Sequence, residues 1–188
     1  LRLQVGRDIE LVNPEDDARY RECWEDYQRL MGREGVTPSM AKAALRRTHT
    51  LIGSMLLRRG DADALLCGLV GRFEQHLDHV RDVIGLREGA HCFATVNALL
   101  LDERTLFLAD TFVNEEPSAE QLAEIAAMAV DELRRFGIPP KVAFVSHSMF
   151  GSSTRPSAKR MREAAKRFKA LRPGVPCDGE MHGDAALS

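Results

Sequence analysis

The segment FVSHSMFGSSTRPSAKRMREAAKRF, residues 144–168, contains the pattern that decides the fold class. It begins within an apolar run, residues 141–146, which predicts a strand. Serines and a glycine then predict a turn, and residues 155–171 predict a basic amphipathic helix. Strands that alternate with amphipathic helices are typical of α/β proteins, in which helices cover the faces of a sheet. We therefore expect an α/β fold.

The first half of the chain also alternates strand and helix patterns. Asn13 is predicted to cap a helix with Pro14 at its first position, and Thr37 is predicted to begin another helix. The other expected elements are a strand at residues 8–12, helices at 49–59 and 73–84, and a strand at 64–70. This last segment, ALLCGLV, is apolar throughout, which predicts a strand that is covered on both faces.

The second half predicts a pair of strands and a capped helix before the strand and helix of residues 141–171. Residues 92–101 and 105–109 read as two strands joined by a tight polar turn. Ser118 and Gln121 form a capping-box pattern in front of a helix that Gly137 ends. Residues 175–188 then read as a strand or a loop, and the pattern alone does not distinguish the two.

The order of expected elements is β-α-α-α-β-α-β-β-α-β-α-β. The helical half meets the paired strands near residues 89–92, which is the expected lobe boundary. We therefore expect residues 1–91 to belong to a first α/β lobe and residues 92–188 to a second.

Composition and charge exclude few classes of protein. The 188 residues are 44% hydrophobic and 29% charged, an ordinary balance for a globular protein with a real core. The net charge of −2 gives no electrostatic argument for a nucleic acid or an anionic membrane as partner. No apolar run approaches the roughly 18 residues that a membrane-spanning helix needs.

The cysteines and the chain ends indicate the compartment and the context. Cys23, Cys67, Cys92 and Cys177 are far apart and form no CxxC pair, so we expect buried free thiols in a reducing cytoplasm. The sequence starts at Leu1 without a methionine. We expect it to be a piece of a longer polypeptide.

The turn after residues 141–146 is the first candidate site. Ser146, Ser148, Ser152 and Ser153 supply hydroxyl groups, and Gly151 allows close approach of the backbone. Loops at the carboxyl ends of strands bind ligands in open α/β sheets, and the N-terminus of the following helix favours anions. The GxxxxGK[ST] pattern of a Walker A loop is absent. An anion or phosphate site and a plain connecting loop both remain open.

Nucleophilic and metal chemistry are less well supported. On a strand, His147 faces away from Ser146 and Ser148, which argues against a Ser–His pair within this triplet. His76 and His79 have a spacing that can hold a metal, but His76 lies on the apolar face of its predicted helix. We therefore expect no metal site and no cofactor within this chain.

The tail DGEMHGDAAL is the last candidate segment. It combines two glycines with the polar residues Asp178, Glu180, His182 and Asp184. Such a segment at a strand end binds a metal or a ligand in some proteins and only turns the chain in others. Composition does not decide between these alternatives.

Four phrases in order resemble one enzyme family. They are GDADALLCGLVG at residues 60–71, FLADTFVNEEPSAEQLAEIA at 107–126, PKVAFVSHSMFGSS at 140–153 and DGEMHGDAAL at 178–187. Together they resemble the phosphate acetyltransferase and butyryltransferase family. The wordings SHSMFGSS and GEMHGDAAL, with GREGVTP and HLDHVRDVIG, are nearest to the C-terminal acetyltransferase-like domain of bacterial NADP-dependent malic enzymes.

The resemblance also has departures that bear on activity. Active acetyltransferases of this family carry an arginine at the position of Met31 and a second one at the position of Asp78. A shifted alignment would bring Arg29 or Arg33 to the first of these positions. An acidic residue repels an anion that a cationic clamp would hold. The family's late Ser–Arg pair and Asp would lie beyond Ser188. The resemblance therefore implies a domain with no catalytic residues that has been reused for regulation.

The resemblance implies a two-lobed fold with a ligand bound between the lobes. The fold would be part of a two-lobed, isocitrate/isopropylmalate dehydrogenase-like sandwich around a cleft. Acetyl-CoA, another acyl-CoA or an acyl phosphate would bind there as an allosteric effector. Contacts would come from the loop serines and glycine named above, with the opposite wall shaped by Gly179 and Asp184.

The resemblance further implies a homo-oligomer, with malate, NADP and a divalent metal bound by a part of the protein that precedes Leu1. Two alternatives stay open. One is an active phosphate acetyltransferase, which converts acetyl-CoA and phosphate to acetyl phosphate and CoA. The other is an oligomerisation module with an empty cleft.

Overall fold

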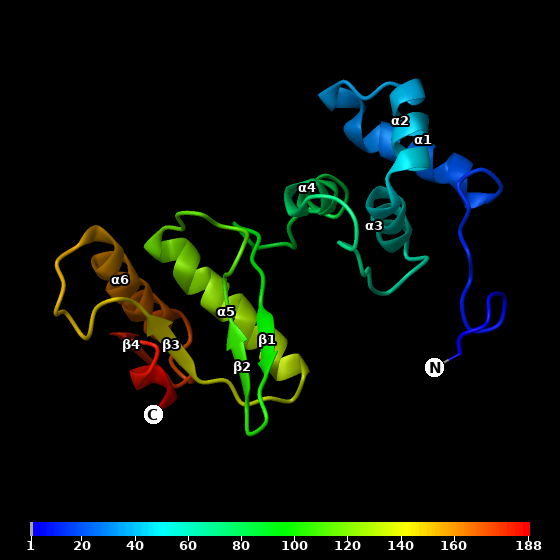
Figure 1. The fold of residues 1–188 in the computed structure, drawn as a ribbon. Coiled ribbons are helices and arrows are strands. Elements are labelled where there is room, and N and C mark those ends of the chain that lie inside the picture. Colours follow the sequence, from blue (N-terminus) through cyan, green and yellow to red (C-terminus); the bar gives the residue numbers. More distant parts are fainter. Residues whose placement is uncertain (1) are drawn as a thin grey trace. The chain divides into compact units, whose positions relative to one another are not determined.

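Helices make up most of the first of the two units into which the chain divides, Leu1–Gly85. The computed structural model describes residues 2–188. Figure 1 shows the helices of this unit in blue to green. They are α1 Arg19–Met31, the 3-10 helix η1 Gly32–Glu34, α2 Pro38–Arg47, α3 His49–Arg59 and α4 Phe73–Val83.

Local signals set the ends of these helices. The N–H of Met40 donates a hydrogen bond to Thr37 Oγ1 at 3.3 Å, so the predicted cap of α2 is confirmed. Gly60 ends α3 with a φ of +80°, a conformation that glycine adopts without strain. The helices share a buried apolar core of Cys23, Tyr27, Ala41, Leu45, Leu51, Met55 and Val83.

The predicted helix start at Asn13 is wrong, because α1 begins at Arg19. Asn13 Oδ1 accepts a hydrogen bond from the N–H of Glu15 at 3.2 Å, and Asn13 Nδ2 donates to Asp16 Oδ2 at 2.8 Å. An asparagine side chain that bonds to the following backbone stabilises a turn as well as a helix cap. The pattern therefore located a bend but not the helix.

Neither of the two strands predicted for the first unit forms among residues 2–85. Residues 8–12 take part only in an isolated bridge between Val5 and Ile9. Residues 64–70 belong to no helix or strand, and Leu66 and Leu69 are 100% and 99% exposed. A strand needs a neighbour that pairs with its backbone N–H and C=O groups. The described residues provide none for either segment.

The cysteines are free thiols, as expected, but they are not all buried. Cys23 and Cys92 are buried and Cys177 is half-buried, whereas Cys67 is exposed. Cys67 lies in the unpaired segment 64–70, so the predicted burial fails there for the same reason as the predicted strand.

The second unit, Leu86–Ser188, has mixed α/β structure. Its elements are β1 Asn97–Leu100, β2 Thr105–Leu108, α5 Ala119–Arg135, β3 Val142–Val145, α6 Pro156–Leu171, β4 Cys177–Met181 and the 3-10 helix η2 Ala185–Leu187. In Figure 1, α5 and α6 lie side by side beside the strands, and these two helices pack against each other. The lobe boundary expected near residues 89–92 stays a prediction.

The strands of the second unit form two separate two-stranded sheets. In the hairpin, β1 and β2 are antiparallel, with Ala98 opposite Phe107. β3 and β4 are parallel, with Ala143 opposite Asp178, and α6 connects them. The core between the helices and β3 contains Ala123, Ala127, Val130, Phe144, Ala164, Ala165, Phe168 and Val175.

The expected elements of the second unit mostly form, although some are shorter. The capping box is confirmed, since Ser118 Oγ accepts from the N–H of Gln121 and Gln121 Oε1 accepts from the N–H of Ser118. β3 and α6 match their predicted ranges closely, and within the tail β4 forms a strand at Cys177–Met181. Residues 92–96 of a predicted strand lie instead in a loop. Within residues 2–188, no helix is both long enough and apolar enough to cross a bilayer.

Candidate functional site

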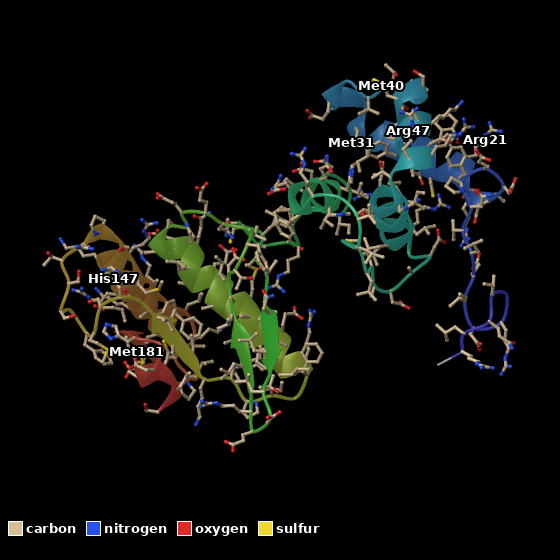
Figure 2. All side chains as sticks on the ribbon, in the orientation of Figure 1. Arg21, Met31, Met40, Arg47, His147 and Met181 are labelled. Atoms are coloured by element: carbon tan, nitrogen blue, oxygen red, sulfur yellow. The ribbon has the colours of Figure 1, made fainter. Side chains whose placement is uncertain are left out.

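The candidate loop connects β3 to α6 and lies against the end of β4. The N–H of Ser146 donates to Met181 O, and the N–H of Phe150 donates to Glu180 O, both at 2.8 Å. These bonds hold both ends of the turn against the last residues of β4. Figure 2 labels His147 in the loop and Met181 in the strand beside it.

Glu180 is the centre of this loop. Its side chain is completely buried, at 0% exposure. Oε1 accepts hydrogen bonds from Ser148 Oγ and from the N–H of Gly151, both at 2.8 Å. Oε2 accepts from Arg162 Nε of α6 at 2.9 Å. One carboxylate therefore joins β4, the loop and the following helix.

The donors around Glu180 keep it ionised. Burial raises the pKa of a carboxyl group, because the charged form loses its hydration. The hydrogen bonds from Arg162, the Gly151 N–H and Ser148 oppose this effect and exceed it, and the pKa falls from 4.5 to about 2. Glu180 therefore carries its negative charge at neutral pH inside the protein.

Three of the four predicted serines make hydrogen bonds within the loop through their hydroxyl groups. Ser148 is only 1% exposed, and its Oγ also accepts from the N–H of Ser153 at 3.1 Å. Ser152 Oγ accepts from the N–H of Met149 at 3.0 Å. Ser153 Oγ accepts from the N–H of Arg155 at 3.3 Å. These hydroxyl groups determine the shape of the turn.

The outward side of the loop has polar groups with no partner among residues 2–188. The hydroxyl of Ser146 makes no hydrogen bond there, and the exposed side chains of Arg155 and Lys159 form no ion pair. α6 begins at Pro156, and no side chain caps it. The N-terminal end of α6 thus offers its backbone N–H groups to an anion, together with the cations Arg155 and Lys159.

Gly179 has a packing role next to this loop. Its φ is +129°, and a Cβ atom there would lie 2.6 Å from Phe144 O. Only glycine allows β4 to approach β3 this closely. Asp184 is exposed, and its Oδ1 accepts from the N–H of Ala185 at 2.9 Å at the start of η2. The Glu180 network does not include Asp184.

Sequence reasoning did not identify Glu180 and Arg162 as the centre of the site. In the sequence, Glu180 is one of several polar residues of the tail and Arg162 is one of several cations of α6. The only local signal was an acidic residue inside a short strand, followed by apolar Met181. A charged residue at a buried strand position indicates a buried partner.

A second carboxylate organises the loop in front of α5. Asp110 Oδ1 accepts from Thr95 Oγ1 at 2.7 Å, and Oδ2 accepts from Asn114 Nδ2 at 2.6 Å. Burial raises the pKa of Asp110, but the bonds from Thr95 and Asn114 outweigh it and the pKa is lowered. Asn114 Nδ2 also donates to Phe93 O at 2.8 Å. This network is structural.

Of the two candidate metal ligands of α4, His76 has hydrogen-bonding partners within the protein. His76 Nδ1 lies 2.6 Å from Thr50 Oγ1, and its Nε2 lies 2.9 Å from Val70 O. Burial lowers the pKa of His79 despite the nearby acidic Asp82 and Asp78. Across residues 2–188 there is no group of three His, Cys, Asp or Glu side chains that could hold a metal ion.

The two positions where the resemblance implies arginine clamps have other roles. Asp78 is exposed on α4, and Arg81 Nη1 lies 2.8 Å from its Oδ1. Met31 is half-buried and packs against the helical core of the first unit. Neither side chain provides a positive charge.

The whole sequence matches one protein family. The family model described as Phosphate acetyl/butaryl transferase matches residues 1–188. The chain is 49% identical to the NADP-dependent malic enzyme of Salmonella typhimurium over 187 residues and 46% identical to the NAD-dependent malic enzyme of Rhizobium meliloti over 188 residues. It is 32% identical to the phosphate acetyltransferase of Haemophilus influenzae over 186 residues.

These relatives are much longer than the chain. The alignments cover 100%, 100% and 98% of this chain but only 25%, 24% and 26% of the three relatives. The chain thus spans about a quarter of the length of the curated relatives it matches.

Solved structures show the same fold. The EutD phosphotransacetylase of Staphylococcus aureus superposes with a TM-score of 0.81 at 25% identity, over 96% of this chain and 55% of that one. A phosphotransacetylase of Streptococcus pyogenes gives 0.81 at 29% identity, over 93% and 53%. The fold is therefore phosphotransacetylase-like.

Proposed function

This chain belongs to the phosphate acetyl/butaryl transferase family, and on that premise we propose that it is the acetyltransferase-like regulatory domain of a malic enzyme. The complete protein would oxidise malate and decarboxylate it to pyruvate. This domain would bind acetyl-CoA, or a related acyl-CoA or acyl phosphate, and shift the enzyme between two states. Such coupling requires that the ligand binds one state more tightly than the other.

The observation that carries the proposal is the difference in identity between the two groups of relatives. The chain is 46–49% identical to malic enzymes and 32% identical to a phosphate acetyltransferase, over nearly the same residues. One of these malic enzymes is NADP-dependent and the other NAD-dependent. In this proposal, the dinucleotide and the divalent metal would bind to the rest of the protein.

The side chains at the two clamp positions support regulation rather than acetyl transfer. Asp78 places a carboxylate where the family resemblance implies an arginine, and Met31 is apolar. A carboxylate near a phosphate or CoA raises the energy of the bound anion by like-charge repulsion. These two side chains therefore argue against acetyl transfer, and binding of an anionic ligand would depend on the cations at the start of α6.

In this proposal, the ligand binds the outward side of the β3–α6 loop. Ser146, Arg155 and Lys159 would contact its phosphate groups, together with the N-terminal N–H groups of α6. Ser148, Gly151, Ser152 and Ser153 would hold the loop backbone in the binding shape through Glu180. Gly179 and Asp184 would shape the neighbouring wall.

We further propose a cytoplasmic homo-oligomer with a two-lobed cleft of the isocitrate/isopropylmalate dehydrogenase kind. The lobes would correspond to residues 1–91 and 92–188 with additional polypeptide. These features follow from the family resemblance, and the measurements below do not depend on them.

The test uses the full-length protein that contains this chain. Calorimetry with acetyl-CoA measures binding, and malate decarboxylation is followed with and without acetyl-CoA. A separate assay measures acetyl-CoA formation from acetyl phosphate and CoA. We expect binding, a change in malate turnover and no acetyl transfer. Robust acetyl transfer would establish the phosphate acetyltransferase alternative, and the absence of heat at millimolar ligand would indicate an oligomerisation module.

A double variant tests the contact residues. Arg155→Ala with Lys159→Ala removes both unpaired cations at the start of α6 and should weaken acetyl-CoA binding by about 10-fold or more. Lys166→Glu, which changes the net charge by the same amount at an exposed position further along the same helix, is the matched control and should leave binding unchanged. Equal effects of the two changes would mean that only the overall charge of α6 matters.

A further inference from the structure

Arg162 of α6 is held in one orientation by two hydrogen bonds. Its Nε donates to Glu180 Oε2 and its Nη2 donates to Ser153 O, both at 2.9 Å. Glu180 is completely buried, whereas the side chain of Arg162 is 42% exposed. The ion pair therefore has its negative end inside the protein and its positive end towards solvent.

One end of the guanidinium group of Arg162 is open. Its Nη1 has no hydrogen-bond partner among residues 2–188. Nη1 lies beside Gly151, where an added Cβ atom would be 3.7 Å away from it. Gly151 has a φ of +96°, which residues with a side chain rarely adopt, so no side chain from this position covers Nη1. Arg162 thus presents unused N–H donors at the surface of the loop.

Arg162 lies in one row with the two other cations of the site. Arg155, Lys159 and Arg162 are spaced i, i+4 and i+7 along the start of α6, which brings them to the same side of the helix. Arg155 and Lys159 form no ion pair in the described chain, so nothing there fixes their long side chains. Arg162 is already fixed, and a fixed side chain loses less entropy when it binds a ligand.

The chemistry of a fixed guanidinium group favours a phosphate as its ligand. Its planar N–H groups bind two oxygens of a phosphate in parallel, which the ammonium group of a lysine does not do. A terminal phosphate carries a charge of about −1.5 to −2 at pH 7 and three acceptor oxygens. Acyl phosphates and the 3′-phosphate of CoA compounds both provide such a group.

We propose that Arg162 is the specificity-determining residue of this loop and that its Nη1, next to Gly151, binds the terminal phosphate of the ligand. The proposal rests on the function proposed above, which places an acyl ligand on the outward side of the same loop. Arg162 supplies the directed positive charge that Met31 and Asp78 do not provide. Glu180 is its positioning residue, because the bond to Oε2 sets the direction of the guanidinium group.

Inorganic phosphate tests this contact without any assumption about the acyl group. Phosphorus NMR measures the binding of phosphate to the full-length protein that contains this chain, as wild type and as Arg162→Lys. We expect Arg162→Lys to bind phosphate about 10-fold more weakly, since lysine keeps the charge but not the planar fork. Arg167→Lys is the matched control, because Arg167 is 44% exposed on the same helix and pairs with Glu120 and Glu163. It should bind phosphate as wild type does.

Calorimetry with three organic ligands separates the two sources of phosphate. They are acetyl-CoA, acetyl-dephospho-CoA, which lacks the 3′-phosphate, and acetyl phosphate. If the 3′-phosphate is bound, Arg162→Lys should weaken acetyl-CoA about 10-fold and acetyl-dephospho-CoA less than about 2-fold. If an acyl phosphate is bound, the loss of about 10-fold should appear with acetyl phosphate and with neither CoA compound. A purely structural role of Arg162 would weaken all three ligands by the same factor.

A second variant covers the case in which Arg162→Lys does not fold, which its melting temperature shows. Glu180→Asp withdraws the carboxylate by one methylene from Arg162 Nε, so the guanidinium group loses its fixed direction. It should reduce the preference for the phosphate-bearing ligand over its dephosphorylated counterpart while Arg162 itself is retained.

Two results would overturn the proposal. One is equal phosphate binding by wild type and Arg162→Lys, and the other is equal weakening of all three organic ligands. Acetyl-CoA binding that is indifferent to Arg162 would refute this inference alone. Phosphate binding through Arg162, in a protein that binds neither acetyl-CoA nor acetyl phosphate, would refute the proposed function and leave the phosphate contact established.

Discussion

At the scale of single residues, Glu180 contributes most to the candidate loop. The variant Glu180→Gln keeps the volume but removes the charge, so Arg162 loses its ionic partner. An amide also cannot accept hydrogen bonds at both ends, whereas the carboxylate accepts from Ser148, Gly151 and Arg162. We expect the free energy of unfolding at pH 7 to fall by about 3 kcal/mol, measured by urea denaturation. Glu116→Gln, at an exposed carboxylate without a partner in the described chain, should change it by less than about 0.5 kcal/mol.

The difference in stability between the wild-type protein and Glu180→Gln should also depend on pH. The pKa of Glu180 is lowered from 4.5 to about 2 in the folded protein. A lowered pKa means that the stabilisation is fully present above about pH 4.5 and is lost as the pH falls towards 2. The difference in unfolding free energy between wild type and Glu180→Gln should therefore shrink between pH 5 and pH 3. A difference that stays constant over this range would show that Glu180 does not titrate as the folded structure implies.

Gly179 gives a second prediction at this scale. Gly179→Ala places a methyl group 2.6 Å from Phe144 O at a φ of +129°, so β4 must move away from β3. We expect a loss of about 2–4 kcal/mol of stability, seen as a lower melting temperature. Gly174→Ala is the matched control, because a Cβ there meets no atom within 4 Å. If both variants melt alike, the close approach of the two strands is not the reason for a glycine at position 179.

At the scale of elements, the capping box of α5 allows a local test. Ser118 Oγ accepts from the N–H of Gln121 at 3.2 Å, and Ser118→Ala leaves this N–H without a partner. We expect a loss of about 1 kcal/mol, measured by thermal or urea unfolding. Ser157→Ala, at an exposed serine in the first turn of α6 that makes no side-chain bond among residues 2–188, should cost nothing measurable. An equal loss in both would argue against a specific capping contribution.

The helices could be predicted from sequence because their signals are local. Thr37 and Ser118 each bond to a backbone N–H three residues later, and a glycine lies beyond the end of α3. Strands depend on partners that are distant in sequence. β3 forms because β4 pairs with it, whereas residues 64–70 have an equally apolar sequence and no partner strand among the described residues. Composition alone predicts the tendency to form a strand but not the presence of its neighbour.

The candidate site shows the same limit. Sequence predicted the β3–α6 loop, its serines and its glycine as one unit, and these residues do lie together. The sequence did not predict that Glu180, about 30 residues away, occupies the inner side of the loop. The link between Ser148 and a residue 32 positions later depends on the parallel pairing of β3 and β4. No local pattern encodes such a contact.

At the scale of the whole molecule, each of the two units has a core of its own. The first core contains Tyr27, Leu45 and Met55, and the second contains Phe144 and Phe168. Trp24 is the only tryptophan in the sequence, and it packs against the first core with Lys42 Nζ 4.2 Å from its ring centre. Its fluorescence therefore reports on the first unit.

Because each unit has its own core, we predict that the units unfold in different transitions. Urea titrations of the 188-residue chain are followed by Trp24 fluorescence and by far-ultraviolet circular dichroism, which reports on the helices of both units. Glu180→Gln removes a hydrogen-bond network of the second unit only. It should lower the midpoint of one dichroism component and leave the midpoint of Trp24 fluorescence unchanged.

The reverse experiment uses Arg59→Ala, which removes the ion pairs of Arg59 with Glu22, Asp26 and Asp61 in the first unit. It should shift the midpoint of Trp24 fluorescence alone. A shift of both signals by the same amount in either variant would mean that the chain unfolds as one cooperative unit, because independent units transmit no destabilisation to each other.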